Sequence, residues 1–420
     1  MGRAGAVSQD TAQDLAQGLA QGHAQNLAQD TAQDLARAAN GVDAETAQAD
    51  TTPAGLSVKP WIAAITPYKG GEGKLAGRDR VIKLSSNENP LGPSPRAVDA
   101  YRRAADDLSV YPDGAAAALR ETLAGAHALD ADRIVCGAGS DEVISLTTRA
   151  LCGPGDEIIH TEFAFSMYRI FAETAGATAV SVPEQALTAD PEAILRAVTP
   201  RTKVIFLANP NNPTGTYLDR GALTDLAERT PPHVLLVIDG AYAEYMRRGD
   251  YEPGFALADR LPNVAVTRTF SKIHGLAALR LGWIYAPRAL ADALNVLRGP
   301  FNVPGPALAA GEAAMRDPDF VEASAIQNEV WRDWLIKELR ECGVETPDSF
   351  GNFILPNFGE QGPASAAAVD GYLRANGVIV RRMEGYGLPG RLRISVGAAA
   401  ENQAVARALR DFLGGSGPAA

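Results

Sequence analysis

The chain has 420 residues, of which 46% are hydrophobic and 21% are charged, a composition typical of a globular protein with more than one domain. Its formal net charge of −11 gives a field that repels nucleic acids and acidic membrane surfaces, so neither is expected as a partner. Any anionic ligand must therefore be held by a few local arginines and backbone N–H groups.

The sequence gives no signal for export or metal binding. No apolar stretch near the amino terminus suggests a secretion signal, and no run approaches the ~18 consecutive apolar residues of a membrane-spanning helix. We therefore expect a cytoplasmic protein. The three cysteines, Cys136, Cys152 and Cys342, form no Cys-x-x-Cys pair, so we predict core packing rather than disulfides or a metal site.

Residues 1–56 form a low-complexity head. From Ala12 to Ala36 the dipeptide Ala-Gln recurs every four residues, and few apolar side chains interrupt it. Such a segment cannot bury enough surface to fold alone, so we expect a frayed helix or a disordered tail without a catalytic role. The alternative is a partner-binding helix that uses a stripe of leucines (Leu15, Leu19, Leu27 and Leu35).

Beyond Ser57, short runs rich in β-branched residues alternate with stretches of helical pattern. This alternation predicts an α/β fold with a mainly parallel seven-stranded sheet, and ligands bind such sheets beyond the carboxyl ends of the strands. The predicted strands are Ile134–Cys136, Glu157–His160, Ala179–Val182, Val204–Ala208, Val234–Asp239, Val264–Arg268 and Gly282–Ala286.

The pattern changes after about residue 300 and predicts a second, smaller α+β domain. A helix is expected over Glu312–Leu339, and Pro304, Gly305 and Pro306 are expected to form a hinge before it. Strands follow at Phe353–Leu355, Val378–Arg381 and Arg391–Val396. We predict an arm at 57–90 that packs with the small domain, a large domain at 91–300 and a small domain at 301–415.

The segment SKIHGLAALRLG begins at Ser271, directly after a predicted strand. A lysine that forms a Schiff base must be neutral to attack a carbonyl, so it needs burial or a nearby cation to lower its pKa. Lys272 is such a candidate, although an isolated lysine after a strand is usually a solvated charge. The hydroxyls of Thr269 and Ser271, with the guanidinium of Arg280, suit a phosphate group.

Other strand ends carry polar residues that would meet Lys272 at the same sheet edge. Asp239 ends an apolar strand, where a carboxylate is costly unless it faces a cation such as a protonated ring nitrogen, although a turn-capping role is the common alternative. Asn212 lies in the rigid loop ANPNNPTG. Ser140 and Asp141 begin a helix after a glycine-rich turn, where backbone N–H groups can bind phosphate.

Together these segments resemble aminotransferases of the aspartate aminotransferase type, which depend on pyridoxal 5'-phosphate (PLP). Within that group the nearer resemblance is to histidinol-phosphate aminotransferases, and it covers roughly Trp61 to Val405. The motifs that carry the resemblance are LSSNENPLGPSP (84–95), YPDG (111–114), TRTFSKIHGLAALRLGW (267–283), VIVRR (378–382) and GRLRISVG (390–397).

The resemblance implies a role for each residue that matches a motif. Lys272 would carry PLP and act as general acid and base, Asp239 would pair with the pyridine nitrogen, and Tyr242 would contact the phenolic oxygen. The implied cofactor-binding residues are Ser140, Asp141, Phe165, Asn212, Asp239, Tyr242, Thr269, Ser271, Lys272, Arg280 and Tyr111. The implied substrate-binding residues are Tyr68, Asn89, Arg381 and Arg393.

The resemblance further implies transamination between histidinol phosphate and 2-oxoglutarate. It also implies a homodimer, in which Tyr111 reaches the PLP phosphate of the neighbouring subunit. Three alternatives stay open. The first is an aminotransferase for phenylalanine or tyrosine, with or without activity on histidinol phosphate, and the second is a PLP decarboxylase of a phosphorylated amino acid. The third is a PLP-sensing regulator, which the lack of a basic helix-turn-helix signal disfavours. Phe165 stands where tyrosine is frequent, and Gly240 stands where relatives carry glutamate.

Overall fold

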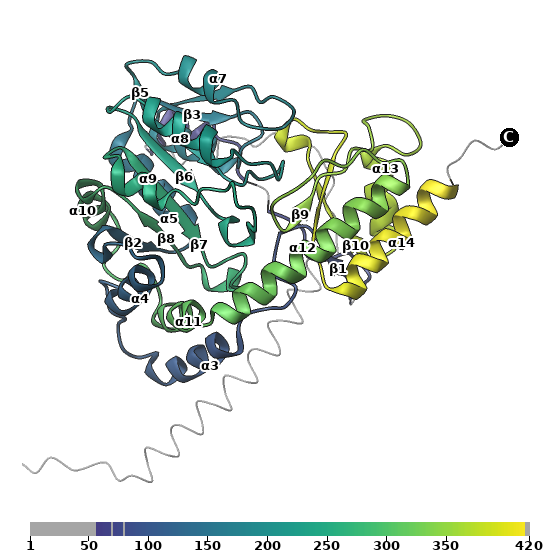
Figure 1. The fold of residues 1–420 in the computed structure, drawn as a ribbon, viewed down its shortest axis with the longest axis horizontal. Coiled ribbons are helices and arrows are strands. Elements are labelled where there is room, and N and C mark those ends of the chain that lie inside the picture. Colours follow the sequence, from purple (N-terminus) through teal and green to yellow (C-terminus); the bar gives the residue numbers. More distant parts are fainter. Residues whose placement is uncertain (1–55, 69, 79, 416–420) are drawn as a thin grey trace, which may run out of the picture. The chain divides into compact units, whose positions relative to one another are not determined.

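The computed structural model describes residues 56–68, 70–78 and 80–415 (Figure 1). The predictions for the head, including its leucine stripe, lie outside the described residues. The compact unit discussed below spans Lys59–Ala420. Its α-helices before the long α12 are α2 Pro60–Ala63, α3 Pro95–Ala104, α4 Ala117–His127, α5 Ser140–Leu151, α6 Met167–Ala175, α7 Pro191–Arg196, α8 Arg220–Arg229, α9 Phe255–Arg260, α10 Arg288–Leu297 and α11 Gly305–Met315.

A seven-stranded sheet forms the centre of the unit, with strand order β2-β8-β7-β6-β5-β3-β4. All seven predicted strands are confirmed, with ends that differ by at most two residues, and so is the α/β fold class. The strands are β2 Ile134–Gly137, β3 Glu157–Thr161, β4 Thr178–Val182, β5 Thr202–Ala208, β6 Leu235–Asp239, β7 Val264–Thr269 and β8 Gly282–Tyr285.

Strand β8 is the exception to the parallel arrangement, because it runs antiparallel to both β7 and β2. The connection from β7 to β8, residues 270–281, contains only a short 3-10 helix (Ala277–Leu279) and no α-helix of the kind that usually links parallel neighbours. It therefore turns back at the carboxyl edge of the sheet, and Lys272 lies in this turn.

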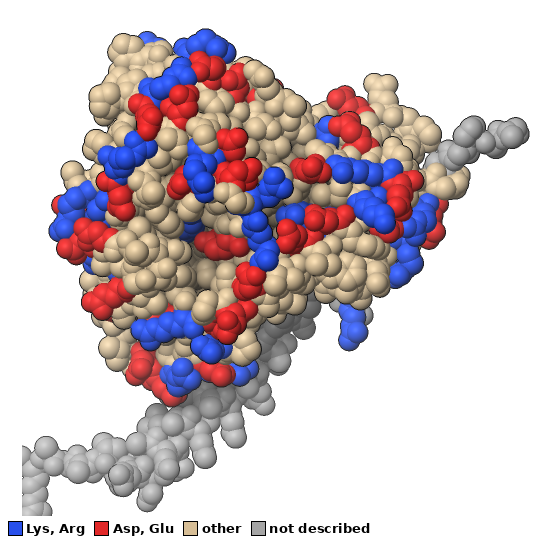
Figure 2. Space-filling model, in the orientation of Figure 1, with Lys and Arg blue, Asp and Glu red and all other residues tan. Residues whose placement is uncertain are grey.

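Alternate residues of each strand face two separate hydrophobic cores. In β5, Val204 and Phe206 pack with α5, α6 and α10, whereas Ile205 and Leu207 pack on the other face with residues of α4, α8, α9 and α11. Both faces are thus covered by helices, as the near-continuous apolar strands require. On the outside, positive and negative side chains intermingle over the face shown in Figure 2.

A smaller layer follows, and its strands belong to two short sheets. β1 Ile82–Lys83 pairs in parallel with β10 Val378–Ile379, so the arm joins this layer. β12 Leu392–Ser395 pairs antiparallel with both β11 Arg381–Arg382 and β9 Phe353–Ile354. The helices that share its hydrophobic core are α12 Pro318–Glu341, α13 Ala366–Ala375 and α14 Ala399–Gly415.

The helical stretch predicted around Glu312–Leu339 is divided between two helices, because α11 ends at Met315 and α12 begins at Pro318. Asp317 has an extended φ of −125°, as expected for the residue before a proline. Pro304, Gly305 and Pro306 begin α11, whose alanines pack in the core of the large sheet. This packing leads us to propose a domain boundary near Arg316, while the ranges 91–300 and 301–415 stay a prediction.

His127 supplies a test of this packing. Its ring lies 5.1 Å from that of Phe255 and 5.6 Å from that of Trp283, and burial lowers its pKa to about 4. Between pH 6.5 and 4 the unfolded chain therefore binds a proton that the folded chain does not. The free energy of unfolding should therefore decrease as the pH is lowered from 6.5 to 4, by up to about 1.4 kcal/mol per pH unit from this residue.

Urea unfolding of the wild type and of His127→Phe at pH 7 and pH 5 measures this contribution. The variant should gain relative to the wild type as the pH falls, while His233→Phe, at an exposed position, should not. If the free energy of unfolding changes equally with pH in both variants, His127 does not have a lowered pKa in the folded protein.

Candidate active site

A cavity of about 410 Å³ opens at the carboxyl ends of β5, β6 and β7. Its volume lies in the range of small-molecule sites. The structure brings most of the predicted site residues together here, although they come from distant parts of the sequence. The predicted residues that line the cavity are Tyr68, Ser140, Asp141, Phe165, Asn212, Asp239, Tyr242, Thr269, Ser271, Lys272 and Arg280.

One end of the cavity gathers hydrogen-bond donors around the amino terminus of α5. Arg280 donates from Nη1 to Ser271 Oγ at 3.2 Å and from Nη2 to Asp141 Oδ2 at 3.1 Å. Gly139 has φ of +87°, and a Cβ there would lie 2.5 Å from Arg280 Nη2. A Cβ on Gly282 would lie 2.3 Å from the backbone nitrogen of Ser140. Glycine permits these approaches, which bring the N–H groups at the start of α5 and the Arg280 guanidinium together in an arrangement suited to phosphate.

Lys272 projects into the middle of the cavity from the turn between β7 and β8. Its Nζ lies 3.4 Å from the carbonyl oxygen of Ser86 and 5.8 Å from the centre of the Tyr242 ring. Burial, with a smaller effect from the positive charge of Arg393, lowers the pKa of Lys272 to about 8. The neutral, nucleophilic fraction of this amine near neutral pH is therefore far larger than for an ordinary lysine, whose pKa is 10.5.

Asp239 ends β6 in a buried position without a cationic partner among the hydrogen bonds and ion pairs of the described residues. Its Oδ2 accepts a hydrogen bond of 2.6 Å from the Tyr168 hydroxyl, and its Oδ1 accepts one of 3.2 Å from the Ala241 N–H. Burial raises the pKa of Asp239 above its ordinary value. A protonated ring nitrogen would supply the missing positive charge and favour the ionised carboxylate.

Tyr168 was not predicted, although it lies in the same EFAFSMY segment as Phe165. The two rings are 5.7 Å apart and nearly perpendicular, and Tyr168 also stacks on Phe206 at 4.9 Å. The spacing of three residues was an available signal, since such residues share a side of a helical turn. Tyr168 thus positions the Asp239 carboxylate through its hydroxyl, while Phe165 lines the cavity.

Two further contacts fix the direction in which hydrogen bonds can point into the cavity. Asn87 Nδ2 donates to the Tyr242 hydroxyl oxygen at 2.9 Å, and Arg393 Nη1 donates to Asn212 Oδ1 at 2.5 Å. Amide and guanidinium nitrogens can only donate, so the hydroxyl hydrogen of Tyr242 and the amide hydrogens of Asn212 remain for a ligand. The cavity therefore offers donors to an oxyanion. Asn87 was missed, although its φ of +56° is a conformation that asparagine tolerates.

The structure does not bring four of the predicted residues into the cavity lining. Asn89 lies behind the Lys272 turn, where its Nδ2 donates to the Ile273 carbonyl oxygen at 2.6 Å, so its predicted contact with substrate has no geometric support. Tyr111 is 80% exposed and stacks on Phe301 at 4.7 Å. Arg381 and Arg393 face each other in the register of β11 and β12.

Arg381 and Arg393 lie near residues that line the cavity, because both charges act on Tyr68 and Arg393 contacts Asn212. Both positive charges lower the pKa of Tyr68, although burial raises it by more. Arg393 donates from Nη2 to the Ser85 carbonyl oxygen at 2.9 Å, while its Nε is buried without a hydrogen-bond partner among the described residues. Arg393 Nε and the neighbouring Arg381 can bind a second anion, in addition to a phosphate at the start of α5.

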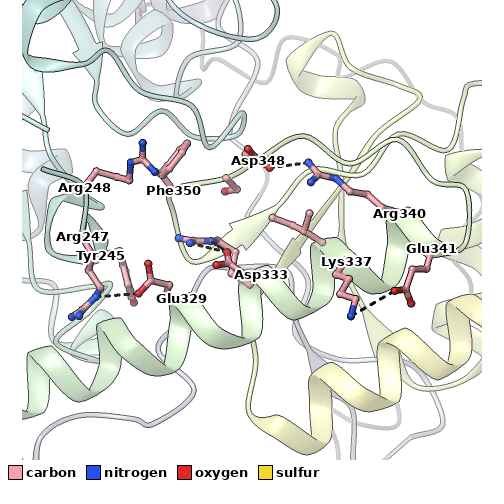
Figure 3. A pocket seen from close by; sticks show the side chains of 13 residues that line it. Tyr245, Arg247, Arg248, Glu329, Asp333, Lys337, Arg340, Glu341, Asp348 and Phe350 are labelled. Carbon is pink, nitrogen blue, oxygen red and sulfur yellow. Dashed lines mark hydrogen bonds and ion pairs between the residues drawn. The ribbon is translucent and has the colours of Figure 1, made fainter. Parts of the chain in front are cut away.

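A second cavity of about 580 Å³ lies along α12 and is lined by five basic side chains (Figure 3). Each of them already has an acidic partner: Arg247 pairs with Glu322 and Glu329, Arg248 with Asp250, Arg332 with Asp333, Lys337 with Glu341, and Arg340 with Asp348. These neutralised charges make this cavity a weaker candidate for an anionic ligand.

The residues of the first cavity fit the cofactor that the sequence resemblance implies. The donors at the start of α5 suit a phosphate, and the buried Asp239 lacks a cationic partner among the described residues. The Tyr242 hydroxyl and the Asn212 amide can donate to an oxyanion. In the described part of the chain, no group of three or more His, Cys, Asp and Glu side chains is arranged for a metal ion. Nor does any helix described here have the length and apolar character to cross a membrane.

Relatives of known name support the same conclusion. The chain is 52% identical to the histidinol-phosphate aminotransferase of Rhodospirillum rubrum over 86% of this chain and 97% of that protein. It is 51% identical to the enzyme of the same name from Dinoroseobacter shibae, over 85% of this chain and 98% of that protein.

Solved structures agree in fold. The crystal structure of histidinol-phosphate aminotransferase from Sinorhizobium meliloti in complex with pyridoxal 5'-phosphate has a TM-score of 0.79 and 28% identity, and covers 85% of this chain and 98% of that chain. A mutant aspartate aminotransferase of Thermus thermophilus, at 22% identity over 85% of this chain and 99% of that chain, shares the fold with a TM-score of 0.74.

The family described as aminotransferase class I and II matches residues 79–412. Because this match spans most of the sequence, the chain belongs to the class I and II aminotransferase family.

Proposed function

We propose that this aminotransferase binds PLP and transfers the amino group of histidinol phosphate to 2-oxoglutarate, giving imidazole acetol phosphate and glutamate. The reaction is reversible and belongs to histidine biosynthesis. The observation that carries the proposal is the presence of two anion-binding sets at one lysine. One set surrounds the start of α5, and the other consists of Tyr68, Arg381 and Arg393. The names of the relatives from Rhodospirillum rubrum and Dinoroseobacter shibae support the same substrate.

When bound, PLP would supply a carbonyl that condenses with amines and a protonated ring that accepts electron density. Lys272 would attack as the neutral amine, which its pKa of about 8 favours. Once displaced by the substrate amine, Lys272 would take the proton from the substrate carbon that bears nitrogen.

The remaining residues would hold charges in place. Asp239 would keep the proton on the ring nitrogen, and the Tyr168 hydroxyl would orient its carboxylate. Tyr242 and Asn212 would donate to the phenolic oxygen, since Asn87 and Arg393 occupy their acceptor atoms. Ser140, Asp141, Thr269, Ser271 and Arg280 would bind the cofactor phosphate.

Arg381 and Tyr68 would bind the phosphate of histidinol phosphate. Arg393 would join them, or would bind the carboxylate of an amino acid or a 2-oxo acid. A phenylalanine or tyrosine aminotransferase would use the same residues without the phosphate contacts, and dual activity stays an alternative. A PLP decarboxylase of a phosphorylated amino acid is a weaker alternative, and its product would be carbon dioxide.

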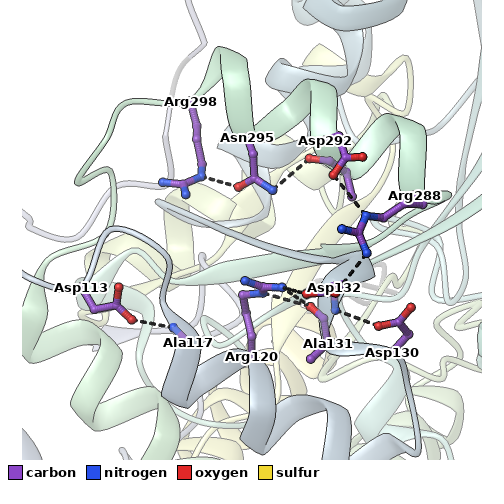
Figure 4. Close-up of polar contacts among 11 residues, drawn as sticks. Asp113, Ala117, Arg120, Asp130, Ala131, Asp132, Arg288, Asp292, Asn295 and Arg298 are labelled. Carbon is purple, nitrogen blue, oxygen red and sulfur yellow. Dashed lines mark hydrogen bonds and ion pairs between the residues drawn. The ribbon is translucent and has the colours of Figure 1, made fainter.

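A homodimer is part of the proposal. An exposed apolar surface surrounds Tyr111, with Leu108, Val110 and Phe301 among its members. Close to Tyr111, the Asp113 carboxylate accepts a hydrogen bond of 2.8 Å from the Ala115 N–H. It also accepts one of 2.7 Å from the Ala117 N–H, shown in Figure 4. We infer that this loop presents Tyr111 to the cofactor phosphate of a second subunit. A cytoplasmic location stays a prediction.

The substrate assignment can be tested by single-turnover mixing of the PLP-loaded protein with histidinol phosphate, phenylalanine or tyrosine, followed through cofactor absorbance. Histidinol phosphate should react fastest. Arg381→Gln should slow that reaction about 10- to 100-fold, the effect of losing a charged hydrogen bond, and leave phenylalanine nearly unchanged.

The matched control is Arg382→Gln on the same strand, where the native arginine pairs with Glu384. Equal wild-type rates with all three substrates would replace the assignment by a broad aminotransferase. Release of carbon dioxide without a 2-oxo acid would indicate the decarboxylase.

Burial of Lys272 gives a prediction that needs no substrate. In the apoprotein, the folded state holds this lysine's proton up to about pH 8, whereas the unfolded state holds it to about 10.5. The buried charge therefore destabilises the fold below pH 8, and this cost disappears as the pH rises towards 10.5. Lys272→Met should raise the free energy of unfolding at pH 7 by at most about 3 kcal/mol.

Urea unfolding of the apoproteins at pH 7 and pH 10 measures the effect, and Lys337→Met on the surface of α12 is the control. A gain for Lys272→Met that is the same at both pH values would contradict the lowered pKa.

The shared site can be tested by mixing two inactive chains. Lys272→Ala and Tyr111→Ala should each be impaired alone. If Tyr111 serves the neighbouring subunit, co-expressed hybrids contain one intact site, and random pairing should restore about a quarter of wild-type activity. Activity that is only the average of the two variants would place Tyr111 in its own subunit's chemistry or outside it.

A further inference from the structure

Glu184 lies after β4, between two loops that carry site residues. Its Oε1 accepts hydrogen bonds of 3.3 Å from the backbone N–H of Phe163 and of 3.3 Å from Asn211 Nδ2. The first loop leads to Phe165, and the second continues directly into Asn212, and both of these residues line the cavity. The Glu184 carboxyl is therefore a link between the two loops, although no step of the proposed reaction uses it.

Two acceptor atoms in this link are left without partners. Glu184 Oε2 and Asn211 Oδ1 are both buried and make no hydrogen bond with any described residue. The Asn211 amide cannot simply be reversed, because its Nδ2 also donates to the Phe163 carbonyl oxygen at 3.2 Å and to Thr214 Oγ1 at 2.9 Å. Buried acceptors without donors are costly, so a missing hydrogen is the simplest way to satisfy both.

We propose that Glu184 is a positioning residue that keeps a proton on Oε2 and donates it to Asn211 Oδ1. The acid and the amide then form a cyclic pair, with Asn211 Nδ2 donating to Glu184 Oε1 in the opposite direction. This pair fixes Phe165 and Asn212 relative to each other, and thus the cofactor ring and its phenolic oxygen. The inference rests on the proposed function only for what the two loops bind.

The charges around Glu184 favour the protonated form. Burial raises the pKa of Glu184 to about 7, with a smaller effect in the same direction from the negative charge of Glu162, while the Thr161 side chain and the Phe163 N–H act in the opposite direction. On the 209–216 loop the facing groups, Asn211 and Thr214, are neutral. On its own segment, Asp190 is engaged by Gln185 Nε2 at 2.7 Å and lies 4.0 Å from Arg196. No cation among the described residues pairs with Glu184 itself.

A pH dependence follows from the geometry. Below about pH 7 the folded chain holds a proton that the unfolded chain releases near pH 4.5, so this residue lowers the free energy of unfolding as the pH rises from 4.5 to 7. Above pH 7 the ionised carboxylate faces the Asn211 amide oxygen, and one of the hydrogen bonds that link the two loops is lost. Cofactor binding should weaken in that range.

Glu184→Gln mimics the protonated carboxyl at every pH, because a glutamine amide offers one acceptor and one donor at the same positions and does not ionise. Two measurements apply to the full chain: urea unfolding of the apoprotein, and the dissociation constant of PLP, each from pH 5 to pH 9. Glu184→Gln should match the wild type at pH 5.5. At pH 9 the wild type should bind PLP about fivefold more weakly than the variant, as for one lost hydrogen bond.

The matched control is Glu162→Gln, an exposed carboxylate of the same region. Because the charge of Glu162 raises the pKa of Glu184, this control should keep a pH dependence of the wild-type kind but move it to lower pH, whereas Glu184→Gln should abolish it. Glu184→Ala should be weakened at every pH. If Glu184→Gln is as weak as Glu184→Ala at pH 5.5, the ionised form is required and the proposal fails. If all variants bind alike, Glu184 has no positioning role. If PLP does not bind, the proposed function fails, while the unfolding measurement still decides where the proton lies.

Discussion

The close approach of the β7–β8 turn to the start of α5 is the constraint on which the site depends. β8 must return antiparallel beside β7, so the turn is pressed against the amino terminus of α5. Gly139 and Gly282 make room for this contact, since a side chain at either would overlap Arg280 or the helix backbone. The turn therefore brings a guanidinium, hydroxyls and the reactive Lys272 to the amino-terminal end of a helix, where an anion is favoured.

The same folding that assembles the site leaves two buried groups poorly satisfied. Burial lowers the pKa of Lys272 and raises that of Asp239, and each shift reflects a charge that the protein alone does not compensate. A ligand that brings a carbonyl to Lys272 and a cation to Asp239 would relieve both. Binding of PLP and folding are thus coupled through the same two residues.

Local sequence predicted the large domain well and the contacts between domains poorly. The seven strands were readable because each is a short apolar run between helical stretches, and Lys272, Asp239 and Arg280 lie at their ends. The break at Asp317 was missed although Pro318 was an available signal, because the residue before a proline disfavours the helical conformation. Asn89 was placed at the substrate through the resemblance alone, but its amide supports the Lys272 turn.

The residues that sequence reasoning could not supply are those whose roles depend on distant partners. Asn87 contacts Tyr242 from 155 positions away, and Ser395 holds Asn87 from 308 positions away. No spacing rule reaches across such separations. Yet these contacts decide which atoms of Tyr242 and Asn212 remain as donors, because Asn87 and Arg393 can only give hydrogens. The arm and β12 therefore set the polarity of a site whose lysine and aspartate belong to the large sheet, so the oxyanion position is complete only when both layers are packed together.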